Sequence, residues 1–389
     1  MVCLAKRITQ TSPKSYGMCD KAALLDAQGA DLIHLEFGRP VHDTPAHIKD
    51  AAIAALRSGK VHYSELQGES PLRAALASKL AQFNKMTVSP NDILITNGLT
   101  HGSFAAFMTL LDAGDEAILL DPHYPQHVGK VELAGARAVM VPLDASDGFS
   151  IRADWIEAAI TPRTRIIILV NPANPTGRPY RRQELEALAD VAIRHDLVVV
   201  SDEVYEFVLY EPDRHISIAS LPGMAERTVS LYAFTKAYAM DGWRLGYAVA
   251  APDIMQGMIK IATNEVTHVN TFIQYGALEA VTNGQAAMDE MIEDDRLKRD
   301  LMVQRLNQMP GVHCPVPDAT IYVFPDIRGT GKSSQVLAEL ILDEAHVVVE
   351  AGSFYGAGGE GHLRLCFGSE THARIDEAMT RMSHVLNRI

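Results

Sequence analysis

Seven short runs of apolar residues recur along the middle of the chain, and they restrict its fold more than any other feature. Their apolar residues are consecutive rather than alternating, which is typical of strands covered on both faces of a mostly parallel sheet. The runs are 93–96, 117–120, 138–141, 166–170, 197–201, 229–233 and 245–250. Amphipathic segments such as 101–111 and 182–195 lie between them. The sequence therefore predicts alternating strands and helices in one large α/β domain.

The last hundred residues have a different pattern, in which helical and strand-like segments are mixed. The helical segments are 285–308, 333–342 and 373–387, and the strand-like segments lie at 320–324 and near residues 347 and 363. No linker rich in Pro, Gly or Ser precedes this part of the chain. We therefore expect a smaller α+β unit that packs closely against the large domain.

Composition and charge exclude several classes of protein. The 389 residues are 47% hydrophobic and 21% charged, which is close to the average for globular proteins. A formal net charge of -13 argues against nucleic acid and anionic membranes as partners. The four cysteines form no CxxC pair, which favours a reducing, cytoplasmic location over disulfides or a metal site. The densest apolar run, 166–170, is far shorter than the roughly 20 residues of a membrane span.

One glycine-rich motif, Gly356 to Gly361, matches the G-x-G-x-x-G pattern of dinucleotide-binding loops. That loop must leave a strand and open a helix, whose N-terminus then binds the pyrophosphate. Here the motif is followed by 362–367, which alternates like a strand. We therefore expect a flexible surface loop rather than a nucleotide site.

A second motif, 329–333, resembles the end of a phosphate-binding P-loop. The full motif requires a glycine five positions before Gly331, where this chain has the anionic Asp326. The sequence instead predicts an ordinary turn between a strand and a helix, with Ser333 or Ser334 as the helix cap.

Polar motifs follow three consecutive strands of the predicted sheet. Asn171-Pro-Ala-Asn-Pro-Thr-Gly177 follows the first strand, Ser201-Asp-Glu-Val-Tyr205 follows the second, and a segment with Lys236 and Arg244 follows the third. Open α/β sheets bind ligands at the carboxyl ends of their parallel strands. We therefore expect an amide, a carboxylate, a phenol, an amine and a guanidinium to meet at one edge.

In combination these motifs resemble those of fold-type I pyridoxal-phosphate enzymes of the aspartate aminotransferase family, the class I and II aminotransferases, and of its thermophilic-type subgroup. The order and spacing match from 35–40 to 363–365. The resemblance implies a mostly parallel sheet of about seven strands flanked by helices, with a smaller α+β domain. It also implies an N-terminal arm with part of the small domain at 1–44, a large cofactor domain at 45–284 and a small domain at 285–389.

The resemblance also assigns roles at the cofactor, pyridoxal 5'-phosphate. Lys236 matches the lysine that forms the Schiff base and moves protons. Asp202 matches the carboxylate beside the pyridine nitrogen, and Tyr205 and Asn174 match the groups that bond the 3-oxygen. Tyr124 matches the aromatic residue stacked on the ring. No metal is implied.

The phosphate group of the cofactor needs a helix N-terminus and a cation. The residues that match these contacts are Gly98, Leu99, Thr100 and Arg244. Tyr63 resembles the tyrosine that reaches the phosphate of a neighbouring subunit, which implies a homodimer with shared active sites. Ala233 replaces a serine that binds the phosphate in many members, and Thr235 is a partial substitute.

For the substrates, an amino acid and a 2-oxo acid, Arg364 matches the arginine that binds the α-carboxylate. Gly38 matches the glycine whose backbone closes over the same group, and Asn174 also contacts the substrate. The segment 262–270, which supplies a distal arginine in dicarboxylate-specific members, has no arginine or lysine. We hypothesise a neutral or basic substrate in a pocket shaped by Glu265 or His268. A dicarboxylate substrate stays an alternative, because the cation Arg39 directly follows Gly38.

Transamination is the expected reaction, because it is the commonest outcome in the family. The same residues also serve C–S β-lyases, synthases and oxidases, which form the alternative. A ligand-sensing or noncatalytic domain is disfavoured. About 35 residues precede the first motif, which is too few for a DNA-binding domain, and the lysine is present.

Overall fold

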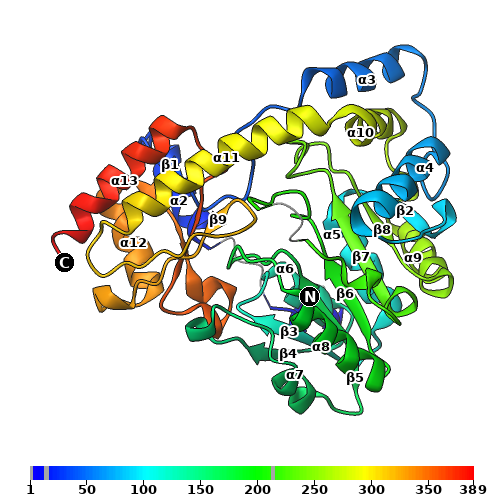
Figure 1. The fold of residues 1–389 in the computed structure, drawn as a ribbon, viewed down its shortest axis with the longest axis horizontal. Helices are drawn as coiled ribbons and strands as arrows, with labels where there is room; N and C mark the ends of the chain where they lie inside the picture. Colours follow the sequence, from blue (N-terminus) through cyan, green and yellow to red (C-terminus); the bar gives the residue numbers. More distant parts are fainter. Residues whose placement is uncertain (1–2, 13–16, 212–214) are drawn as a thin grey trace.

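The computed structural model describes residues 3–12, 17–211 and 215–389. A seven-stranded sheet forms its larger part (Figure 1), with the strand order β2-β8-β7-β6-β5-β3-β4. Its strands are β2 (Ile93–Thr96), β3 (Glu116–Asp121), β4 (Arg137–Pro142), β5 (Thr164–Val170), β6 (Val198–Asp202), β7 (Thr228–Ala233) and β8 (Gly246–Val249). All seven apolar runs are therefore strands of one sheet, and the prediction of an α/β fold is confirmed.

The sheet is parallel except at β8, which runs antiparallel to both β2 and β7. Neighbouring residues of the central strand β5 enter different cores. Ile167 and Leu169 pack on one face, and Ile166 and Ile168 pack on the other. Each such buried side chain contributes about 1.5–3 kcal/mol. Consecutive apolar residues therefore reflect a strand that is covered on both faces, whereas the edge strand β4 is partly exposed.

Helices cover both faces of this sheet (Figure 1). The core with Ile166 and Ile168 includes residues of α5 and α9, and the core with Ile167 and Leu169 includes residues of α7 and α8. The helices of this part of the chain are α3 (Ala46–Arg57), α4 (Ser70–Lys79), α5 (Gly98–Leu110), α6 (Gln126–Leu133), α7 (Ala153–Ala159), α8 (Arg182–Arg194), α9 (Pro252–Glu265) and α10 (Thr271–Asn283).

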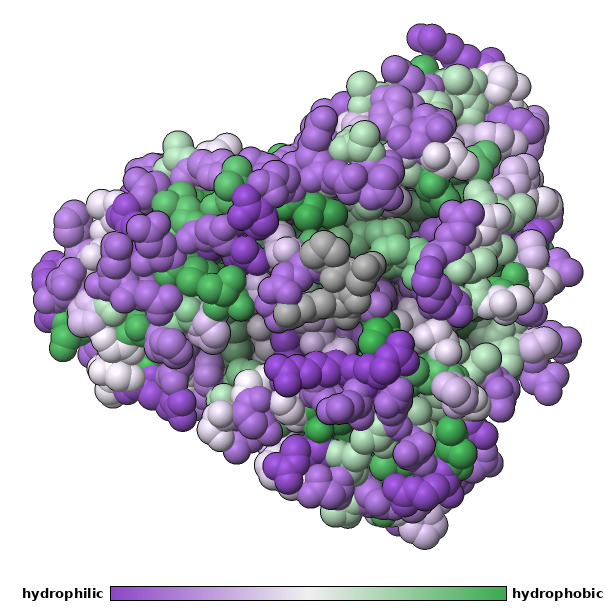
Figure 2. Space-filling model, in the orientation of Figure 1, coloured by the Kyte–Doolittle hydropathy of each residue, from purple (hydrophilic) through white to green (hydrophobic). Residues whose placement is uncertain are grey.

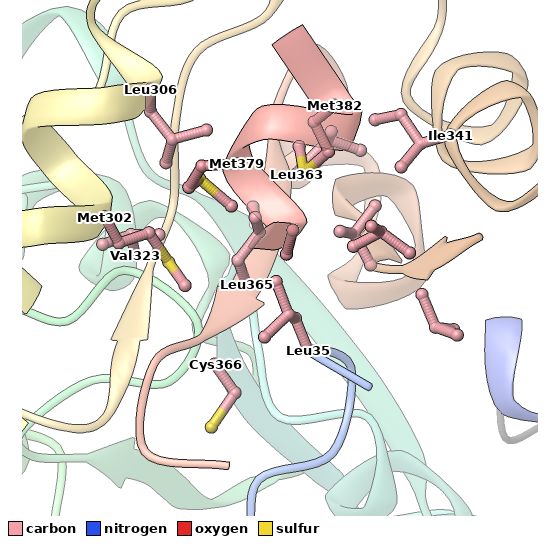
Figure 3. Close-up of a cluster of buried hydrophobic side chains, with 14 of the residues drawn as sticks. Leu35, Met302, Leu306, Val323, Ile341, Leu363, Leu365, Cys366, Met379 and Met382 are labelled. Atoms are coloured by element: carbon pink, nitrogen blue, oxygen red, sulfur yellow. The ribbon is translucent and has the colours of Figure 1, made fainter. Parts of the chain in front are cut away.

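Both ends of the chain contribute to the second, smaller unit. Its helices are α2 (Met18–Ala27), α11 (Gln285–Leu306), α12 (Ser334–Ala345) and α13 (His372–Leu386). Its strands are β1 (Ile33–His34), β9 (Tyr322–Val323), β10 (Val347–Val348), β11 (Glu350–Ala351) and β12 (Leu363–Cys366). Figure 3 shows Leu35 in one core with Leu365 and Met379. The predicted α+β pattern after residue 285 is confirmed, and the boundaries at 44 and 284 stay a proposal.

Helix α11 joins the two units, because it runs from beside α10 in the large unit to α13 in the small one (Figure 1). Hydrophilic side chains predominate along its exposed side (Figure 2). The short helix α1 (Lys6–Gln10) packs against α6 of the large unit, whereas α2 packs against α12 of the small unit. The N-terminal part of the chain therefore contacts both units.

The two glycine-rich motifs lie in a turn before α12 and in a loop before β12. Ser333 caps α12 by accepting from the amide of Val336, as predicted. The motif Gly356–Gly361 is followed by strand β12, also as predicted, but it is packed rather than free on the surface. A Cβ at Gly356 would lie 2.0 Å from the Oδ1 atom of Asp121. The loop approaches the end of β3 so closely that position 356 has no room for a side chain.

Across the described ranges 3–12, 17–211 and 215–389, no helix is both long enough and apolar enough to cross a membrane.

Candidate active site

A cavity of about 870 Å³ lies where the carboxyl edge of the large sheet meets the small unit. Ten of the twelve site residues predicted from the sequence line it: Gly38, Leu99, Thr100, Tyr124, Asn174, Asp202, Tyr205, Lys236, Arg244 and Arg364. The strand directions explain this convergence. Because β5, β6 and β7 are parallel, the segments that follow them meet at one edge.

Lys236 enters the cavity from the turn after β7. Its side chain is half-buried, and its Nζ atom donates to the backbone carbonyl of Gly38. Burial lowers the pKa of Lys236. A larger share of this amine is therefore uncharged near neutral pH than for a lysine in water, which suits it to react with a carbonyl carbon or to accept a proton.

Asp202, the last residue of β6, places a buried carboxylate in the cavity. One of its oxygens lies 3.2 Å from the Nε2 atom of His127, and the other accepts from the amide of Val204 at 3.2 Å. Burial lowers the pKa of His127, so its ring is neutral near pH 7 and can donate only one N–H. Tyr124 lies edge-on to this imidazole, with ring centroids 5.2 Å apart.

Tyr205 and Asn174 are each hydrogen-bonded to another side chain that lines the cavity. The hydroxyl of Tyr205 donates to that of Tyr322 at 2.8 Å, and burial raises the pKa of Tyr205. The side-chain oxygen of Asn174 accepts from Arg364 at 3.3 Å. This orientation leaves the amino group of the amide as a hydrogen-bond donor.

The N-terminus of α5 and Arg244 form a cradle for an anion. The helix begins at Gly98, where φ is 76°, and Leu99 and Thr100 extend its first turn into the cavity. A Cβ at Gly98 would lie 2.7 Å from an Nη atom of Arg244. Exposed backbone N–H groups, the helix dipole and a guanidinium together favour a phosphate. Ala233, at the end of β7, adds no hydroxyl to this cradle.

Arg364, on strand β12, places a second guanidinium in the cavity. It lies between the rings of Tyr322 and Tyr355, 4.3 and 4.9 Å from their centroids. One Nη atom donates to the carbonyl of Glu36. Its Nε atom is buried and finds no hydrogen-bond partner among the described residues. Arg364 therefore keeps a donor available for a carboxylate ligand.

Gly38 faces Tyr322 across the cavity. A Cβ at this position would lie 1.8 Å from the hydroxyl of Tyr322, so any side chain here would displace that ring. The glycine therefore allows two contacts to form side by side: that of its own carbonyl with Lys236, and that of the Tyr322 hydroxyl with Tyr205.

Two predicted residues do not line this cavity. Gly98 is the first residue of α5 and belongs to the cradle, but it does not itself line the cavity. Tyr63 lies on the surface, 88% exposed, and its ring stacks on that of His268 at 4.8 Å. The segment 262–270, which includes His268, therefore lies next to Tyr63 on one exposed face.

Sequence reasoning missed two residues that take part in the site. His127 lies three positions after Tyr124, and its amide donates to the carbonyl of Tyr124 in the turn that opens α6, so this short spacing could have indicated it. Tyr322 lies on β9, opposite Cys366 of β12. Only the register of these two strands brings it beside Arg364, and no short motif carries that information.

The chain matches the family model for aminotransferases of class I and II over residues 30–382. It is 38% identical to an aspartate aminotransferase of Pyrococcus abyssi, with 92% of each chain covered. It is 37% identical to an arginine–pyruvate transaminase of Pseudomonas aeruginosa, over 92% of this chain and 91% of the relative. The solved aspartate aminotransferase of Thermus thermophilus with maleate superimposes with a TM-score of 0.94 at 34% identity, covering 99% of this chain and all of the other. This chain is a member of the class I and II aminotransferase family.

Proposed function

We propose that this aminotransferase binds pyridoxal 5'-phosphate through the cavity residues and uses it to move an amino group between an L-amino acid and a 2-oxo acid. The observation that carries the proposal is the set of groups around one cavity. An amine, a carboxylate, an anion cradle and a guanidinium with an unused donor line the same space. Each of the four has a matching group on the cofactor or on an amino acid.

The chemistry of the donors around the cavity suits this cofactor. Gly98, Leu99, Thr100 and Arg244 would hold the phosphate, because they already form a cradle at a helix N-terminus. The carboxylate of Asp202 would face the pyridine nitrogen. Tyr205 and the amino group of Asn174 would donate to the 3-oxygen, and Tyr124 would stack on the ring.

The bound cofactor supplies an aldehyde and an electron-withdrawing ring, which together make the proton on the substrate Cα removable. Lys236 would hold the cofactor at its aldehyde and, as a free amine once the substrate is bound, would move this proton as a base. Arg364 would bind the substrate carboxylate, which would fix the direction of the Cα–H bond relative to Lys236. The rings of Tyr322 and Tyr355 exclude water from this ion pair.

The visible spectrum of the protein tests this proposal. Wild-type protein mixed with pyridoxal 5'-phosphate should acquire a visible band that an amino acid removes and a 2-oxo acid restores. Lys236→Ala should lose the covalent attachment and this exchange. Lys260→Ala, which removes an exposed lysine of α9, should behave like the wild type. A wild-type protein that takes up no cofactor would contradict the proposal.

We also infer a homodimer whose subunits share their active sites. Tyr63 is exposed next to His268, and large apolar side chains are exposed close to it in the sequence, among them Val61 and Leu66. A second copy of the chain would cover these side chains. Tyr63 would then reach the phosphate cradle of the partner.

Mixed dimers test the shared site. Tyr63→Ala chains keep Lys236, and Lys236→Ala chains keep Tyr63. A dimer with one chain of each kind contains one intact site if Tyr63 acts across the interface. Co-refolded mixtures should therefore be more active than either parent alone, whereas a sum of the two parental activities would exclude the shared site.

The substrate of highest activity is inferred to have no side-chain carboxylate. The segment 262–270 lies beside Tyr63 and contains no cation, whereas it contains Glu265 and His268. Named relatives at 38% and 37% identity act on aspartate and arginine, so overall identity does not select between these substrates. Steady-state kinetics over a panel of amino acids decide the question, and a dominant kcat/KM for aspartate would overturn the inference.

The state of the cysteines agrees with the proposed cytoplasmic location. All four cysteines are free thiols in the structure, and Cys314 and Cys366 are buried. Proteins in reducing compartments keep their thiols in this form. Thiol alkylation in freshly lysed cells should label the accessible cysteines without prior reduction.

A further inference from the structure

Two buried glutamates flank Tyr205. Glu203 is 0% exposed and Glu206 is 5% exposed, and both belong to the turn that follows Asp202. Neither lines the cavity. A buried carboxylate is costly unless it is paired and hydrogen-bonded, so two of them in four residues require a structural explanation.

Glu203 is held by three side-chain donors. It accepts from Ser201 at 3.0 Å, from the hydroxyl of Ser217, and it lies 2.8 Å from the Nε2 atom of His215. Its backbone amide also donates to the carbonyl of Leu231 in the neighbouring strand β7, at 2.8 Å. Glu203 therefore joins the end of β6 to the segment 215–217.

Glu206 is held from the other side by α4 and the residues after it. It forms an ion pair with Lys79 and accepts from the amide of Asn84 at 2.8 Å. The same amide group donates to Ser217 at 2.8 Å. Asn84 and Ser217 thus connect the partners of Glu206 with the partners of Glu203, and the two glutamates belong to one continuous polar network.

Lys79 is enclosed by aromatic rings within this network. Its Nζ atom lies 4.7 Å from the ring centroids of both Phe207 and Tyr232, and 3.2 Å from the hydroxyl of Tyr247. Burial lowers the pKa of Lys79, and Glu206 opposes this effect. Loss of Glu206 would therefore leave a buried ammonium without its carboxylate.

The spacing of Glu203, Glu206 and His215 would also suit a metal ion, because their ligand atoms lie within 4.8 Å of one another. The ammonium of Lys79 already supplies the positive charge beside Glu206, and Asn84, Ser201 and Ser217 supply the remaining donors. The two carboxylates are satisfied by these side chains, so we look for the role of the cluster in what it holds in place.

We propose that Glu203 and Glu206 are positioning residues, whose network with Lys79, Asn84 and Ser217 fixes the turn that carries Asp202 and Tyr205. This inference rests on the proposed function, in which Asp202 and Tyr205 contact the cofactor. The backbone supports the connection, because the amide of Glu206 donates to the carbonyl of Glu203 at 3.0 Å, closing a tight turn around Tyr205. A shift of either glutamate moves the phenol.

The test compares Glu206→Gln and Glu203→Gln with Glu116→Gln. Glu116 is an equally buried carboxylate with arginine partners, but it lies at the amino end of β3, on the opposite edge of the sheet. All three variants should melt at lower temperature than the wild type. Only the first two should bind pyridoxal 5'-phosphate about tenfold more weakly, the size typical of losing a group that orients a ligand contact.

Two further measurements separate positioning from stability. The visible band of the bound cofactor should titrate at higher pH in Glu206→Gln and Glu203→Gln, because a displaced phenol stabilises the deprotonated 3-oxygen less well. In protein without cofactor, the amide of Val204, which donates to Asp202, should exchange faster in these two variants than in Glu116→Gln. Unchanged cofactor affinity, titration and exchange in the first two variants would overturn the proposal.

A double variant keeps the proposal testable if Glu206→Gln folds poorly. Lys79→Met with Glu206→Gln removes both charges, so no ammonium is left unpaired, and the melting temperature should recover relative to Glu206→Gln alone. Cofactor affinity should stay low, because the anchor of the turn is still missing. Recovery of both properties would assign the pair to stability alone.

Failure of the wild type itself to bind cofactor would contradict the proposed function. Faster exchange of the Val204 amide in Glu206→Gln and Glu203→Gln would still support the network.

Discussion

The Nε2 atom of His127 lies 3.2 Å from the Oδ2 atom of Asp202, and both residues are almost fully buried. The imidazole comes from α6 and the carboxylate from the end of β6. A neutral histidine can donate to this carboxylate and so hold both its charge and its direction. The group that is proposed to face the pyridine nitrogen is thus itself oriented by a residue outside the sequence motifs.

We expect His127→Phe to weaken binding of pyridoxal 5'-phosphate by about tenfold or more, since a hydrogen bond to a charged group contributes about 1.5–3 kcal/mol. Fluorescence titration of the protein with the cofactor measures this change. His195→Gln is the control, because His195 is a partly exposed histidine that is also paired with a carboxylate, that of Glu157. Equal affinities for the two variants would show that His127 has no such role.

Gly38→Ala should lower kcat/KM strongly, because the new Cβ would occupy the position of the Tyr322 hydroxyl. Tyr322 would have to move, and Tyr205 would lose its hydrogen-bond partner. Removing that hydroxyl should relieve the overlap, so Gly38→Ala combined with Tyr322→Phe should be more active than Gly38→Ala alone. Steady-state kinetics of the three variants check this, and a double variant no better than Gly38→Ala would contradict the steric explanation.

The glycine-rich loop of the small unit gives a prediction about stability. Gly356→Ala should lower the free energy of unfolding by more than about 2 kcal/mol, since the position combines a positive φ with a Cβ only 2.0 Å from Asp121. Gly331→Ala is the matched control: its φ is also positive, but nothing lies within 4 Å of the new Cβ. It should cost about 1 kcal/mol. Urea unfolding measures both, and equal losses would refute the packing argument.

Glu350 gives a pH-dependent prediction. It pairs in register with Arg364 and accepts from the amides of Met18 and Ala351. Burial raises its pKa from 4.5 to about 7. Between these values the folded protein binds a proton that the unfolded chain has released, so this group's contribution to stability is present below pH 4.5 and is lost as the pH rises through 7.

Wild-type protein should therefore lose up to about 3 kcal/mol of unfolding free energy between pH 4.5 and 8 relative to Glu350→Gln, in which this proton is absent. Urea unfolding at several pH values gives the two curves. Glu186→Gln, which removes a half-exposed carboxylate of α8, should run parallel to the wild type. Parallel curves for all three proteins would show that Glu350 does not take up this proton.

The fold followed from the sequence because a covered strand has a strong signature. All seven apolar runs became strands, since residues such as Ile166 and Ile167 are buried on opposite faces and both must be apolar. The direction of β8 in the sheet could not be predicted from the sequence. A short apolar run carries no direction, and the antiparallel pairing of β8 with β2 and β7 depends on the path of the chain between them.

The sequence also predicted part of the site, namely the residues whose place depends on the order of the strands. Motif residues such as Asp202 and Lys236 lie at the carboxyl ends of strands or a few residues beyond them, so strand order brings them together. Tyr322 lines the cavity and His127 contacts Asp202 through packing between separate elements, which the sequence motifs do not record. Tyr63 matched a motif, yet it lies outside its own chain's cavity, and its proposed contact needs a second copy.

The core in Figure 3 has a consequence for synthesis of the protein. Leu35 packs there with Leu365 and Met379, more than 300 residues later in the chain. Gly38 and Arg364 can take their places only when both ends of the chain have met. The sheet with its proposed cofactor cradle has all of its strands long before that point, whereas the proposed carboxylate-binding part must wait for nearly the last residues. If these proposals hold, a nascent chain acquires the means to hold a cofactor well before it can select a substrate.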